Sequence, residues 1–173
     1  MVLAAKSLPA IATKLAEIAD PWNKFYSHSK VASATVLFLH LVPLIVGAGV
    51  AFTADLATLR AGRAGPAERE RQLIELSGTH RLVLFGLTIS VLSGIALFLS
   101  DVETFWASIF WWIKLLLVVL LLINGLVLTR TEAALARDRQ DTAAWGRLRT
   151  VAILSVVLWI TTTLAGVVLS QFA

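Results

Sequence analysis

The chain has no cysteine and few charged residues, and each of these features excludes some classes of protein or chemistry. Of its 173 residues, 15% are charged and 58% are hydrophobic. Without cysteine the chain has no disulfide, no thiolate ligand for zinc or an iron–sulfur cluster, and no thiol nucleophile. An average soluble domain carries roughly 25% charged residues, so this composition argues against a soluble globular protein. Histidine, carboxylate, lysine and hydroxyl groups are left to carry any chemistry.

Four long apolar runs predict an all-α membrane protein. Each run has about the 20 residues that a helix needs to cross a bilayer. The runs are Val31–Ala54, Thr79–Ser100, Phe105–Leu128 and Thr150–Phe172. We therefore predict a four-helix transmembrane bundle over residues 31–173, with neighbouring helices antiparallel and a tight turn at Asp101–Thr104.

Residues 1–30 are predicted to form a separate N-terminal interfacial segment. Within Leu3–Ala19, apolar residues recur every three or four positions, which predicts an amphipathic helix lying in the membrane interface. Asp20-Pro21 is expected to end this helix. We expect the segment to be retained, because Lys14 interrupts the apolar core that a signal peptide would need.

The arginines predict how the bundle is oriented. The net charge is +4, and every arginine flanks one of two charged connections, 55–78 and 129–149. The positive-inside rule places both connections in the cytoplasm and both termini outside a bacterial inner membrane. The basic charge is then a topological signal, and no nucleic-acid partner is needed to explain it. The charged segment Pro66–Leu76 is expected to be a cytoplasmic extension of a helix.

Two ionisable residues, His40 and Lys114, lie inside predicted spans, where such groups are costly and often functional. Each lies about 4 Å to the outer side of its span's centre. The first and third helices run in the same direction, so the two residues are predicted to lie at matching depth. Ser93 and Thr163 of the other two spans fall near the same level. These residues predict a polar layer across an apolar bundle.

Three roles are possible for His40. Gly47 lies two turns along the same helix face and leaves room for a neighbouring helix or a flat ligand. His40 then hydrogen-bonds across a closely packed bundle, or ligates a haem iron or copper, or relays protons. His28 and His80 are expected to be ordinary interfacial residues, with His80 opening the second helix. His80 lies roughly 20 Å in depth from His40, so the two cannot share one iron.

Lys114 has no carboxylate in any predicted span core to pair with it. A reach to the outer headgroups is long from this depth. The amine is therefore either desolvated or paired with a bound anionic ligand, such as a porphyrin or a quinone-like molecule.

Two segments carry a family resemblance. The first is Phe38-Leu39-His40-Leu41, followed by Gly47 and Gly49, and the second is Phe110-Trp111-Trp112-Ile113-Lys114-Leu115. They resemble segments of HemJ-type protoporphyrinogen oxidases and copper-resistance D-type proteins. The hydrophobic part also looks like an uncharacterised bacterial family of four-span membrane proteins. The HemJ resemblance implies a bound haem b, with His40 as iron ligand and Lys114 as a porphyrin contact or second ligand.

We therefore expect a b-type haem-binding redox protein, acting on a porphyrin-like or quinone-like substrate, with lipid as its surroundings. The expected cofactor-binding residues are His40, Lys114, Gly47, Ser93 and Thr163, with His40 on the metal. One alternative is a non-catalytic subunit or assembly factor of a membrane complex, or a homo-oligomer. Another is copper or proton-coupled transport, against which the single methionine, the absence of cysteine and the absence of carboxylates within the predicted spans argue. The residues leave open whether any reaction is catalysed.

Overall fold

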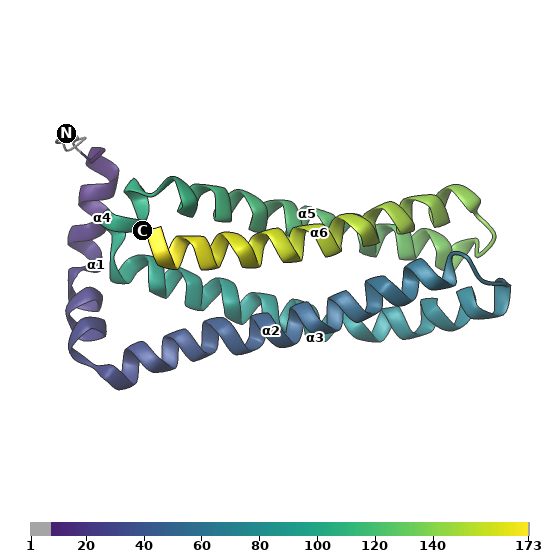
Figure 1. The fold of residues 1–173 in the computed structure, drawn as a ribbon, viewed down its shortest axis with the longest axis horizontal. Helices are drawn as coiled ribbons and strands as arrows, with labels where there is room; N and C mark the ends of the chain where they lie inside the picture. The colour runs from purple at the N-terminus through teal and green to yellow at the C-terminus, as the bar shows by residue number, and fades with distance from the viewer. Residues whose placement is uncertain (1–7, 173) are drawn as a thin grey trace.

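The computed structural model describes residues 8–172, with only the backbone at Ser77, and these residues form six helices. The helices are α1 (Ala10–His28), α2 (Lys30–Ala61), α3 (Pro66–Ser100), α4 (Val102–Ala107), α5 (Ile109–Arg137) and α6 (Thr142–Phe172). Of these, α2, α3, α5 and α6 are long and apolar enough to cross a membrane. They lie side by side with alternating directions (Figure 1). The four-helix bundle of a multi-pass membrane protein is thus confirmed.

The spanning helices are longer than the apolar runs, so the charged connections are short. α2 continues to Ala61 and α3 begins at Pro66, which confirms the predicted helical extension at Pro66–Leu76. Proline suits the first position of a helix because its missing N–H has no partner there anyway. The connections 62–65 and 138–141 lie at the same end of the bundle (Figure 1). We call this the arginine-rich end.

Helix α1 does not end at Asp20-Pro21 as predicted but continues through Pro21 to His28. It crosses the opposite end of the bundle (Figure 1). There the indole N–H of Trp22 donates to the Ala96 carbonyl at 2.8 Å, and the Asn23 amide donates to the Ser100 carbonyl at 2.5 Å. These contacts hold the helix beyond the proline, although proline removes one backbone hydrogen bond. Residues 3–7 of the predicted amphipathic helix lie outside the described residues.

The expected turn at Asp101–Thr104 is instead the short helix α4, and the third spanning helix begins at Ile109 rather than Phe105. The Asp101 carboxylate accepts a hydrogen bond from the Thr104 backbone N–H at 3.2 Å, which caps α4. An aspartate in this position favours a helical turn over a simple reversal.

The helices pack unevenly. α2 packs along α3 and along α6, and α5 packs along α6, whereas α3 and α5 touch at few places. The closest approach of α2 and α3 is at Gly86, where an added Cβ would lie 2.7 Å from the Pro43 carbonyl oxygen. A glycine is required there, and this close crossing brings the His40 segment of α2 against α3.

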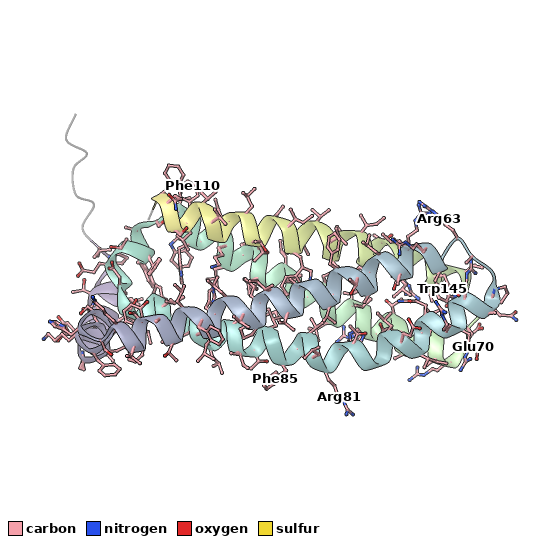
Figure 2. The ribbon with its side chains drawn as sticks, turned by 60° about the horizontal axis from the view of Figure 1, so that its bottom comes forward. Arg63, Glu70, Arg81, Phe85, Phe110 and Trp145 are labelled. Carbon is pink, nitrogen blue, oxygen red and sulfur yellow. The ribbon has the colours of Figure 1, made fainter. Side chains whose placement is uncertain are left out.

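The outer faces of the helices are apolar. Phe85 is 64% exposed, and it points away from the bundle together with Arg81 (Figure 2). Trp145, by contrast, is buried at the arginine-rich end against Leu76, Leu135 and Leu148. Apolar outer faces are compatible with contact to a lipid bilayer.

Candidate functional site

His40 is anchored to α3 from two sides. Its Nδ1 lies 2.9 Å from the Ser90 carbonyl oxygen and 3.3 Å from the Ser93 hydroxyl. The Ser90 hydroxyl in turn donates to the His40 carbonyl at 3.0 Å. Because a carbonyl only accepts hydrogen bonds, Nδ1 carries the proton and the neutral ring keeps its lone pair on Nε2.

Lys114 of α5 meets this lone pair in the bundle interior. The Lys114 Nζ lies 3.5 Å from the His40 Nε2, which confirms that the two residues lie at matching depth. An ordinary hydrogen bond from nitrogen is roughly 2.7–3.2 Å long, so this contact is long. No carboxylate within residues 8–172 forms an ion pair with Lys114. We call His40, Ser90, Ser93 and Lys114 the His40–Lys114 layer.

Two glycines give the nitrogen-bearing side chains their room. A Cβ added to Gly94 of α3 would lie 3.2 Å from the His40 Cε1. One added to Gly166 of α6 would lie 3.4 Å from the Lys114 Nζ. Both positions are tight, so a larger residue at Gly94 would displace the imidazole ring. In the sequence, Gly94 and Gly166 each lie one to three residues from a predicted polar residue. This spacing does not reveal that they contact His40 and Lys114.

The other predicted site residues separate into two groups. Ser93 joins His40, whereas Gly47 is buried in the crossing with α3, where its added Cβ would meet the Val83 carbonyl at 3.7 Å. Thr163 is exposed, and its hydroxyl donates to the Trp159 carbonyl at 2.8 Å. The structure therefore does not bring Gly47 and Thr163 to His40. The buried threonine of this run is Thr162, whose hydroxyl has no hydrogen-bond partner.

A second polar layer lies toward the arginine-rich end. His80 does not open a helix as expected, because α3 begins at Pro66, and its Nε2 lies 2.5 Å from Glu132 of α5. Asp55 of α2 is 2% exposed and lies near Ser155 of α6. We call these four residues the Asp55–Glu132 layer. The sequence does carry a signal for it, since Asp55, His80 and Glu132 all lie near the same ends of three predicted spans.

Within residues 8–172 no three histidine or acidic side chains are grouped so that they could hold a metal ion. Comparison of the chain with protein-family models, with curated proteins and with solved structures finds no match. The resemblance to HemJ-type and copper-resistance D-type proteins therefore stays a prediction.

Proposed function

We propose that the protein is a b-type haem-binding redox protein of a bacterial inner membrane, with His40 as an iron ligand. One observation carries the proposal. His40 Nε2 and Lys114 Nζ face each other inside the bundle, and neither has a hydrogen-bond partner nearer than 3.5 Å among the described residues. Buried polar groups without good partners are costly, so two such nitrogens are expected where a ligand completes the site.

The residues around His40 fit a haem ligand. Iron-ligating histidines usually donate their other ring nitrogen to a carbonyl or carboxylate, which fixes the ring and makes the ligating nitrogen more basic. The contact between His40 Nδ1 and the Ser90 carbonyl does this. Gly94 lets the imidazole ring lie directly against α3, and α3 and α5 touch at few places.

Each residue then has a distinct task. Haem, when bound, supplies one-electron chemistry. His40 offers Nε2 as a ligand, and the Ser90 carbonyl holds the imidazole in the required tautomer. Lys114 supplies a positive charge for a porphyrin carboxylate or for an oxygen atom of a porphyrin-like or quinone-like substrate. The surrounding apolar helices exclude water from the site.

The orientation follows from the arginines and from α1. We place the arginine-rich end in the cytoplasm, which puts α1 and the C-terminal end of α6 on the outer side. Helix α1 buries Ala12 and Ala19 but leaves Ile11 and Ile18 66% and 77% exposed. Such a helix suits the membrane interface, where its exposed apolar residues enter the lipid.

A second candidate function is a subunit or assembly factor of a larger membrane complex. It is favoured by the fact that the contact between His40 and Lys114 joins α2 to α5, whose backbones do not pack against each other. Polar side chains often act as such links between membrane helices. In this case His40→Ala lowers the stability of the bundle, and a partner protein or a second copy co-purifies.

The absorption spectrum of the purified protein tests the haem proposal. Protein from haem-replete cells is measured oxidised and after reduction with dithionite. We expect haem bands in the wild type and in the control His28→Ala, whose histidine is exposed on α1, and their loss in His40→Ala. A colourless wild type contradicts the proposal. Haem bands that persist unchanged in His40→Ala exclude His40 as the ligand.

A further inference from the structure

The Asp55–Glu132 layer has no role in the function proposed above. It takes one polar side chain from each spanning helix, namely Asp55, His80, Glu132 and Ser155. On α2, Asp55 lies fifteen residues after His40, which is about 22 Å along a helix. The two layers are therefore separate sites, and either can exist without the other.

Two carboxylate oxygens in this layer are buried without partners. Asp55 is 2% exposed and its Oδ2 has no hydrogen-bond partner. The Glu132 side chain is 14% exposed, and its Oε1 is likewise buried and unpartnered, while its Oε2 contacts His80 at 2.5 Å. An ionised carboxylate in such surroundings is costly unless a cation or a proton neutralises it.

No lysine or arginine of the described residues forms an ion pair with Asp55 or Glu132. The titratable groups that interact with Asp55 are His80 of α3 and Glu132 of α5, and α6 contributes the uncharged Ser155. With an imidazolium and two carboxylates the layer carries one net negative charge. One further proton removes that charge, and the side chains are not grouped to hold a metal ion instead.

A groove in the surface of the bundle reaches this layer. It has a volume of about 410 Å³, lies between α3 and α5, and includes Glu132, Thr129 and Ala136 in its wall. Glu70 and Arg139, which form an ion pair with each other, line it at the arginine-rich end (Figure 2 labels Glu70). The groove thus reaches from this charged surface to one of the two buried carboxylates.

We infer that Asp55, His80 and Glu132 form a buried proton-binding site that exchanges protons with water at the arginine-rich end through this groove. A hydronium ion in the groove gives one proton to the layer. One O–H bond of the hydronium breaks, one O–H bond forms on a carboxylate oxygen, and the layer passes from one net negative charge to none. The proton in the hydrogen bond between His80 and Glu132 is already counted in the imidazolium, so the added proton is held by a carboxylate oxygen without a partner, Asp55 Oδ2 or Glu132 Oε1. No electron moves and no other bond changes.

Infrared pH-difference spectra of the full chain in lipid nanodiscs test this inference. We expect a carbonyl band of a protonated carboxylic acid in the wild type at neutral pH, and a shift of this band in D2O. The band is reduced or lost in Asp55→Asn and in Glu132→Gln. It is unchanged in the control Glu75→Gln, whose side chain on α3 is 58% exposed and does not line the groove.

Access is tested separately with Ala136→Phe, which fills the groove without replacing a titratable group. We expect deuterium to reach the buried acid several-fold more slowly in this variant. Circular dichroism and gel filtration identify variants that fail to fold, and the D2O shift of the wild type does not depend on any variant.

Three results would overturn the inference. They are the absence of an acid band in the wild type, a band that survives in both Asp55→Asn and Glu132→Gln, and removal of the band by Na⁺, Mg²⁺ or Zn²⁺ at constant pH. The last result would make the layer a cation site. None of these outcomes depends on haem, so this test and that of the haem proposal fail independently.

Discussion

The two polar layers of the bundle leave opposite kinds of groups unsatisfied. In the His40–Lys114 layer the under-satisfied atoms are nitrogens, deep among apolar side chains. In the Asp55–Glu132 layer they are carboxylate oxygens beside a groove. Nitrogen donors suit a metal or an anionic ligand, whereas carboxylates near water suit protons. On α2, about 22 Å of largely apolar helix separates His40 from Asp55, so one bundle contains two distinct polar environments.

The largest effect is expected from removing the buried cation of the His40–Lys114 layer. In haem-free protein, Lys114→Met is expected to raise the free energy of unfolding by about 2 kcal/mol, since a lysine inside a membrane span costs that much or more. The same substitution is expected to weaken haem binding. The free energy is measured by titration with a denaturing detergent. The control is Lys24→Met, which removes an exposed lysine paired with Asp20 and should change stability by less than about 1 kcal/mol. A loss of stability in Lys114→Met would instead support the role of Lys114 as a link between helices.

The second test removes the crossing that holds His40 against α3. Gly86→Ala places a methyl group 2.7 Å from the Pro43 carbonyl oxygen, so the helices must separate. We expect a loss of about 1–3 kcal/mol in the free energy of unfolding. Gly49→Ala is the matched control on α2, because an added Cβ there meets nothing within 4 Å. Equal stability of the two variants would show that the close crossing does not stabilise the bundle.

A smaller effect is expected beside the imidazole ring. Gly94→Ala puts a methyl group 3.2 Å from the His40 Cε1 and should tilt the ring. We expect haem affinity to fall about tenfold, or about 1.4 kcal/mol. Gly125→Ala, which meets nothing within 4 Å, is the control for helix propensity. Haem titration measures both, and unchanged affinity in Gly94→Ala would remove the glycine from the site.

The smallest effect is expected at Ser93. Its hydroxyl lies 3.3 Å from His40 Nδ1 but already donates to the Ile89 carbonyl at 2.7 Å. Ser93→Ala should therefore lower haem affinity by about threefold or less, near the average of about 0.6 kcal/mol for a hydrogen bond between membrane helices. A tenfold loss would mean that Ser93, and not only the Ser90 carbonyl, orients the imidazole.

Much of this arrangement could be predicted from the sequence, because the rise of a helix is fixed. The four spans and the meeting of His40 with Lys114 follow from counting residues along helices of known pitch. The contact at 3.5 Å confirms that count. Depth alone does not fix how each helix is rotated about its axis, which is why Thr163 faces outward while its neighbour Thr162 is buried.

Other features depended on tertiary contacts that the sequence does not display. Pro21 is a strong helix breaker in a sequence, yet contacts from Trp22 and Asn23 to α3 keep α1 helical beyond it. The Asp55–Glu132 layer does not follow from any single span, because its charged members lie at the ends of three different spans. A comparison of ionisable residues at the ends of different spans would have grouped Asp55, His80 and Glu132.

Haem titration into the haem-free protein in lipid nanodiscs tests the central claim most directly. We expect saturation at one haem per chain, loss of this binding in His40→Ala, and its retention in Asp55→Asn, which alters only the other layer. Wild-type protein that never saturates, or that binds haem no better than His40→Ala does, would contradict it.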